Sequence, residues 1–262
     1  MQTHFIPELK ADLCYHDFPG YLPAIVTLHG LGMASSSWFP PCFAHPGLRD
    51  HRAILIDLLG FGYSDRPQDF SYDMEAHAQT VAHVLDELQL NQCIVLGHSM
   101  GGSIAILLAQ SRPDLVGSLL VAESNLDPGP GLVSRIITSF SEADFVDGGY
   151  TQFIADMWAA GARDYAHSVR AADPRAVHRS AVSLIAGRSP TYGECLAALK
   201  MPRTYLFGSE SLPNPDVAAL RNAGVHVAIV PDAGHDMMGD NARGFSDTVA
   251  SMIHADGHET RS

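Results

Sequence analysis

The sequence predicts an α/β fold in which a mainly parallel sheet is covered by helices on both faces. Short apolar runs rich in β-formers recur along the 262 residues, with helical patterns between them. One such run, from Cys93 to Leu96, passes within a few residues into a helix of small residues. The length and the 46% hydrophobic content suit one large domain with a substantial core and room for an inserted subdomain.

The predicted strands are short, and each ends in a loop rich in Gly, Ser, Asp or Pro. At the N-terminus, Phe5 to Leu9 and Asp12 to Tyr15 are predicted to form an antiparallel hairpin at the sheet edge. The apolar runs predicted as buried strands are residues 24–28, 53–58, 94–96, 118–122, 204–207 and 226–230.

Three segments are predicted as helices that pack on this sheet. Residues 74–90 carry apolar residues on one face and charge on the other, which is typical of an amphipathic crossover helix. On this helix His77 and His83 are interpreted as solvated imidazoles. A second helix runs from Met100 to about residue 110, a closing helix from Met238 to about residue 254, and residues 258–262 are predicted to be a frayed tail.

The regular strand spacing is interrupted between Leu126 and Leu199, where helical patterns follow the segment Asp127-Pro-Gly-Pro-Gly. This insertion is predicted to be a helical cap at 126–196 over a core formed by 1–125 and 197–262. Apolar and aromatic residues of the insertion are interpreted as pocket lining or, equally well, as packing of the cap on the core. These residues are Ile136, Ile137, Phe140, Phe153, Met157 and Trp158, of which Met157 and Trp158, with Gly30 and Gly32 of the core, are the predicted substrate-pocket residues.

Composition excludes several classes of function. The formal charge of −13 repels nucleic acid phosphates and anionic lipid surfaces, so neither is an expected partner. Four scattered cysteines, no apolar leader and no long apolar run indicate a cytoplasmic protein without disulfides. The fourteen histidines include no H-E-x-x-H pattern, so no metal and no cofactor are expected, and no oligomeric state is predicted.

The most informative segment is Gly97-His-Ser-Met-Gly101, where a strand ends in G-x-S-x-G and a helix begins. A reversal this tight requires a strained residue with small neighbours, which leaves Ser99 exposed at its apex as a nucleophile. The following helix directs its free amides and positive dipole end to the same point.

A serine nucleophile needs a base and an oxyanion site. His235 is the candidate base because it lies on the loop that leaves the last strand, whereas His98 is expected to pack under the turn. The backbone amides of Met100 and of Leu31, in the loop His29-Gly-Leu-Gly32, are the candidate oxyanion donors.

These motifs, together with the segment Asp57 to Asp65 and Ala233-Gly-His235, resemble the α/β-hydrolase fold superfamily in identity and in order. The resemblance implies a mainly parallel eight-stranded sheet with helices on both faces and a helical cap insertion. It also implies Ser99 as the nucleophile and His235 as the general base.

The orienting acid departs from the commonest family pattern, in which a G-x-x-D turn follows the strand at 204–207. Here the turn reads Gly208-Ser-Glu-Ser211, with serine in place of aspartate. Glu123, at the end of the strand beside the nucleophile's strand, is the favoured replacement, as in members similar to zearalenone lactonase. Glu210 is the alternative acid, and Asp216 is a weaker candidate. If Glu123 is not the acid, it is interpreted as a strand-end carboxylate that caps the following turn. Asp236 is adjacent to His235 in sequence, too close for its carboxylate to reach the ring nitrogen of His235 easily. Asp57 lies on the far side of the first loop, where relatives use it structurally.

The sequence therefore predicts a serine hydrolase that cleaves a small carboxylic ester or lactone through an acyl-enzyme. Hydrolysis of a carbon–carbon bond in a diketone uses the same residues and stays open. A receptor or cyclase on the same fold, without hydrolysis, is the alternative from another class.

Overall fold

A computed structural model describes residues 1–129, 131–255 and 257, so the predicted tail at 258–262 lies outside the described residues. Its centre is one eight-stranded sheet of order β1-β2-β4-β3-β5-β6-β7-β8, which confirms the predicted fold class. The first two pairings, β1 with β2 and β2 with β4, are antiparallel and the other five are parallel. The strands are β1 Gln2–Ile6, β2 Ala11–Phe18, β3 Leu22–Leu28, β4 His51–Ile56, β5 Cys93–His98, β6 Val116–Ala122, β7 Arg203–Gly208 and β8 His226–Val230.

The central strands are buried on both faces, as their continuous apolar runs require. Every residue of β5 is buried, and it pairs with β3 on one side and β6 on the other. The six predicted runs all lie in or overlap strands. The hairpin is shifted, because Pro7 begins a turn in which the amide of Lys10 bonds to the Pro7 carbonyl, so the first strand ends at Ile6 and not at Leu9.

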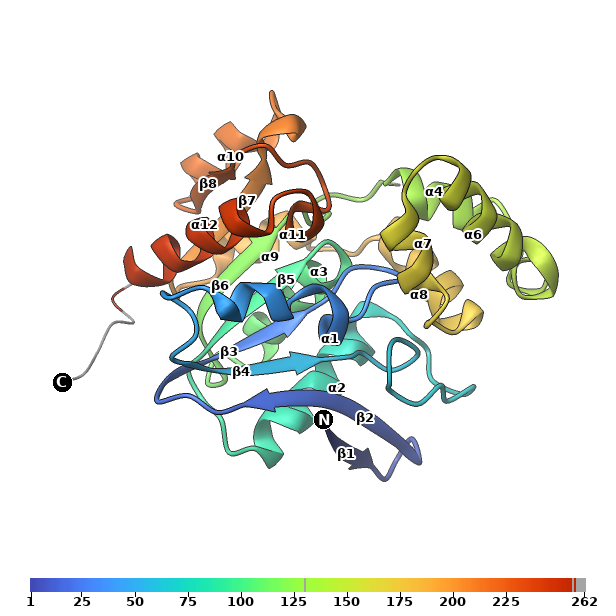
Figure 1. Cartoon of the computed structure of the whole chain (residues 1–262), viewed down its shortest axis with the longest axis horizontal. Coiled ribbons are helices and arrows are strands. Elements are labelled where there is room, and N and C mark those ends of the chain that lie inside the picture. The colour runs from blue at the N-terminus through green and yellow to red at the C-terminus, as the bar shows by residue number, and fades with distance from the viewer. Residues whose placement is uncertain (130, 256, 258–262) are drawn as a thin grey trace.

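Helices cover both faces of the sheet (Figure 1). Helices α1 (Ser35–Trp38) and α12 (Ala242–Ala255) lie on the near face, and α2 (Met74–Glu87), α3 (Met100–Ser111) and α9 (Tyr192–Ala198) lie behind it. The shorter helical segments of the core are η1 Pro40–Ala44, η3 Ser209–Ser211, α10 Asp216–Asn222 and α11 Met237–Asp240. The start of α2 is set by Asp73, whose side chain accepts a hydrogen bond from the Ala76 amide at 2.7 Å.

The prediction that His77 is solvated is wrong. Its side chain is fully buried on α2, and its ring contacts the rings of Phe61, Phe70 and Tyr72. The segment between β4 and α2 folds over the helix and covers the face on which His77 lies. Burial lowers the pKa of His77 to about 3, so its imidazole is neutral near neutral pH.

The closing helix is divided at Asn241 into α11 and α12. The Asn241 side chain accepts a hydrogen bond from the Gly244 amide at 2.9 Å and donates one to the Pro231 carbonyl at 2.8 Å. Asn241 thus caps a new helix and ends the previous one, which the apolar periodicity alone does not reveal.

Most of the segment between β6 and β7 forms helices beside the sheet, where Figure 1 shows α4, α6, α7 and α8 grouped together. Its last helix, α9, instead packs against α3. None of the helices described has the length and the continuous apolar character needed to cross a bilayer. The helical segments of this insertion are α4 Leu132–Thr138, α5 Glu142–Asp144, η2 Phe145–Gly149, α6 Tyr150–Ala159, α7 Arg163–Val169, α8 Pro174–Ala186 and α9.

Candidate active site

Ser99 lies between β5 and α3 in the strained conformation that the G-x-S-x-G pattern predicts, with φ of 51° and ψ of −119°. A β-carbon at Gly97 would lie 2.3 Å from the carbonyl oxygen of Gly101, and one at Gly101 would lie 2.2 Å from that of Leu28. Both glycines are therefore required by close backbone contacts. The contact with Leu28 also brings the turn against the end of β3, where the loop of Gly30 and Leu31 begins.

His235 lies on the loop after β8, and its Nε2 is 3.2 Å from the Ser99 hydroxyl oxygen. Its side chain is 56% exposed, so the imidazole is reached from solvent. When Nε2 accepts the hydroxyl proton, Nδ1 carries the other ring proton and faces away from the serine.

Glu123 directly follows β6 and faces that second ring nitrogen. Its backbone has a positive φ of 47°. One carboxylate oxygen, Oε1, accepts a hydrogen bond from the Gly208 amide at 2.8 Å, and the other, Oε2, lies 4.0 Å from His235 Nδ1. Among the described residues, Glu123 is the acid found paired with His235. Glu210 and Asp216 are not found paired with it. Glu210 lies on the exposed turn Ser209–Ser211, where its amide donates to the Ala233 carbonyl at 3.0 Å.

Hydrogen bonds from β7 hold the Glu123 turn in place. The buried Tyr205 hydroxyl donates to the Ser124 carbonyl at 2.6 Å, and the Glu123 amide donates to the Leu206 carbonyl at 3.1 Å. Together with the bond between the Gly208 amide and Oε1, three hydrogen bonds to β7 fix the position of a carboxylate that follows the neighbouring strand, β6. The sequence analysis did not single out Tyr205, because a tyrosine in a buried strand is ordinary.

The loop after β3 is held by two side chains that leave its Leu31 amide free. The His29 imidazole donates from Nδ1 to the Gly30 carbonyl at 2.9 Å and accepts at Nε2 from the Leu58 amide at 3.0 Å. Burial lowers the pKa of His29, which keeps it in this neutral form. From α7, the Tyr165 hydroxyl donates to the Leu31 carbonyl at 3.0 Å. No hydrogen bond from the Leu31 or Met100 amide to another described residue is found.

His98 is buried beneath the turn, in the place predicted for it, and makes a contact that the sequence did not reveal. Its Nε2 donates to the backbone carbonyl of His235 at 2.8 Å. Burial lowers the pKa of His98 to about 3, so it acts as a neutral donor. The residue before the nucleophile therefore holds the backbone of the candidate base.

A cavity of about 520 Å³ opens over Ser99 and His235, and most of its lining is apolar. Gly30 and Met157 line it, as predicted, whereas Gly32 and Trp158 are not among its lining residues. Gly32 is packed instead under Tyr165 and Val169. Trp158 is 40% exposed, and the guanidinium groups of Arg163 and Arg170 lie over its ring, 5.4 and 5.8 Å from the centroid.

Other residues line the cavity without having been predicted to do so. Leu132 and Val133 of α4, Tyr165 of α7 and Asp236 are among them. Burial raises the pKa of Asp236. Ligand atoms of Asp236, His98 and His235 lie within 4.8 Å of one another, the one such group found among the described residues. Each imidazole also makes a hydrogen bond through Nε2, His98 to the His235 carbonyl and His235 to Ser99.

The chain resembles known proteins in sequence and in fold. Residues 25–248 match the model of the alpha/beta hydrolase family. The chain is 36% identical over 110 residues to a 2-hydroxymuconate semialdehyde hydrolase of Pseudomonas sp. strain CF600, covering 42% of this chain and 38% of that protein. It is 28% identical over 260 residues to an esterase of Mycobacterium tuberculosis, covering 89% of this chain and 84% of the esterase.

Among solved structures, an esterase from Exiguobacterium antarcticum superposes with a TM-score of 0.79 at 18% identity, covering 96% of this chain and 98% of that one. Such a likeness extends over the whole fold. By sequence, in contrast, the chain spans only between 23% and 38% of the lengths of three curated relatives that it matches.

Proposed function

The chain belongs to the alpha/beta hydrolase family, and from that premise we propose that it cleaves carboxylic esters, lactones included, through an acyl-enzyme on Ser99. The observation that carries the proposal is the 3.2 Å contact between His235 Nε2 and the hydroxyl of a serine held at a φ of 51°. A serine in that strained position, within hydrogen-bond reach of an imidazole, is the arrangement that nucleophilic acyl transfer needs.

In the first step the Ser99 oxygen attacks the ester carbonyl while its proton passes to His235 Nε2. The negative oxygen of the tetrahedral intermediate is bound by the Leu31 and Met100 amides. His29 and Tyr165 support this step indirectly, because they bond the carbonyls of Gly30 and Leu31 and so orient the loop. Collapse of the intermediate expels the alcohol, which takes the proton from His235.

In the second step a water molecule attacks the acyl-enzyme. His235 takes one proton from that water and returns a proton to the Ser99 oxygen as the acid product leaves. The exposed imidazole gives water access to the position where it is needed.

We assign the orienting acid to Glu123. A carboxylate 4.0 Å from His235 Nδ1 favours the imidazolium that forms in both steps, and its bond to Gly208 fixes its direction. This variant resembles zearalenone lactonase in having the acid after the strand beside the nucleophile's strand. Glu210 is the alternative and is tested below.

The substrate we propose is a small, largely apolar ester or lactone. The cavity volume of about 520 Å³ and its apolar lining support this class. We propose that residues 126–196 form the cap over it, since Leu132, Val133 and Met157 of this segment are among the lining residues. The four cysteines, all buried free thiols, support a reducing, cytoplasmic setting.

Labelling with a fluorophosphonate probe tests the nucleophile directly. We expect stoichiometric modification, located at Ser99 by mass spectrometry, and no modification of Ser99→Ala. Turnover of aryl esters, alkyl esters and lactones of graded ring size then identifies the substrate class. A wild-type protein that folds but is not labelled and turns over no ester would reject the proposal in favour of a receptor or cyclase on this fold.

Carbon–carbon bond hydrolysis is a second candidate because of the 36% identity to a 2-hydroxymuconate semialdehyde hydrolase. The same nucleophile and base serve that reaction. If carbon–carbon bond hydrolysis is the function, we expect ring-fission diketones to be turned over faster than any ester of equal size. The opposite ranking favours ester hydrolysis.

A further inference from the structure

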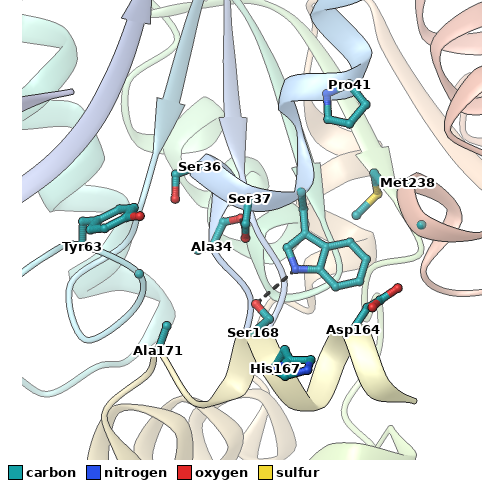
Figure 2. A pocket seen from close by; sticks show the side chains of 13 residues that line it. Ala34, Ser36, Ser37, Pro41, Tyr63, Asp164, His167, Ser168, Ala171 and Met238 are labelled. Carbon is teal, nitrogen blue, oxygen red and sulfur yellow. Dashed lines mark hydrogen bonds between the residues drawn. The ribbon is translucent and has the colours of Figure 1, made fainter. Parts of the chain in front are cut away.

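A second cavity, of about 540 Å³, lies between α1, the loop at Gly62 and Tyr63, α7 and α11 (Figure 2). It shares no lining residue with the cavity over Ser99. Neighbouring residues of α7 nevertheless face the two cavities, since Tyr165 lines the first and Asp164 the second. Its volume lies within the range of small-molecule sites.

An indole, that of Trp38, and a carboxylate, that of Asp164, line one end of this cavity. The Trp38 ring is held by a hydrogen bond from its Nε1 to the Ser168 hydroxyl at 3.1 Å, which Figure 2 draws as a dashed line. In the same view Asp164, Met238 and His167 lie at this end, and Tyr63 lies at the opposite end. Asp164 is exposed, and no hydrogen bond or ion pair of its side chain is found among the described residues.

Two serines of the lining are engaged by hydrogen bonds within the protein. Ser36 donates to Asp57 at 2.7 Å, and Ser37 donates to the Ala34 carbonyl at 3.1 Å. Asp164 is the only formally charged lining residue in the described chain. A guanidinium, that of Arg66, reaches the Gly62 and Ala171 carbonyls near the Tyr63 end. The Asp57 carboxylate lies at that end too, where it accepts a hydrogen bond from the Tyr63 amide at 3.1 Å. The formal charge contributed by the lining itself is therefore that of Asp164, at the Trp38 end.

From the indole and the carboxylate at the Trp38 end, we propose that the second cavity binds a small organic cation, an ammonium group on an apolar body. The ammonium lies against the Trp38 ring and the Asp164 carboxylate, and the body extends past Ala34 and Ala171 toward Tyr63. An indole is the best aromatic partner for a cation, and a nearby carboxylate adds to the attraction. The net charge of −13 raises the local concentration of cations around the protein.

Trp38 provides a direct readout of binding, because the chain has one other tryptophan, Trp158. In a Trp158→Phe background, the emission of Trp38 is titrated with choline and with its uncharged isostere 3,3-dimethylbutan-1-ol, both at pH 8. We expect a saturable change with choline and binding of the neutral isostere about three- to tenfold weaker.

Asp164→Asn in the same background is expected to weaken choline binding about threefold or more and to leave binding of the neutral isostere unchanged. Asp147→Asn removes an equal charge from an exposed position outside the cavity and is expected to change neither. The proposal is overturned if choline gives no saturable change, if the two probes bind equally, or if both aspartate variants behave alike. None of these readouts depends on hydrolysis, so they are independent of the function proposed above.

Discussion

Replacement of Glu123 by glutamine removes the charge beside His235 and keeps the shape of the side chain. The amide oxygen of glutamine still accepts the bond from the Gly208 amide, so the local backbone stays in place. Two unit charges 4.0 Å apart attract by about 1 kcal/mol in water and about 4 kcal/mol at an effective dielectric of 20. Because the Glu123 side chain is 11% exposed and His235 is 56% exposed, the relevant value lies between these limits. We expect kcat to fall between about fivefold and a thousandfold.

The assay is steady-state hydrolysis of a chromogenic ester that the wild-type protein turns over, with the thermal midpoint of each variant measured alongside. Glu210→Gln is the matched control, since it changes the same kind of residue on the exposed turn after β7. We expect Glu210→Gln to keep more than half of the wild-type kcat. If Glu123→Gln is as active as the wild type while Glu210→Gln loses activity, the assignment of the acid is refuted.

Three further substitutions test other parts of the argument. His77→Leu should stabilise the protein by about 1–3 kcal/mol in urea unfolding at pH 7, because neither ring nitrogen of this buried histidine has a partner among the described residues. The folded-state pKa of about 3 lies below the unfolded value, so the wild type should also lose about 2 kcal/mol relative to the variant by pH 5; equal pH profiles would contradict this. Tyr205→Phe removes the bond to Ser124 and should lower kcat several-fold at unchanged KM, and a change in KM alone would count against a positioning role. Gly101→Ala places a β-carbon 2.2 Å from the Leu28 carbonyl oxygen and should abolish fluorophosphonate labelling, whereas a labelled, folded variant would show that the turn adapts.

The sheet and the Ser99 turn were predictable because their signals are local. Strands such as β5 are buried throughout, so their apolar runs stand out. Gly97 is required by a contact with Gly101, four residues along the chain, although Gly101 itself is required by the distant Leu28 carbonyl. The place of Glu123 at the end of β6, the strand beside β5, was predictable in the same way, whereas its role as the orienting acid stays a prediction.

The features that were missed depend on contacts that an apolar period does not report. His77 lies on a helix with an apolar stripe, and only the folding of residues 57–73 over that helix buries it. Trp158 is an aromatic residue of α6 that lies partly exposed at the surface, with two arginines over its ring. Asn241 divides the last helix by a side-chain cap that reads as an ordinary polar residue within an apolar period. Periodicity reports which face is apolar, but not what covers it.

The hydroxyl of Tyr165 has a consequence for engineering. This tyrosine sits on α7, between β6 and β7 in the chain, yet its hydrogen bond supports the backbone of Leu31 in the loop after β3. A chimera that receives these helices from a relative, in order to change which molecules it accepts, would exchange this support together with the specificity. Its turnover would then drop for a reason unrelated to fit, unless the donor sequence brings a hydroxyl to the same spot.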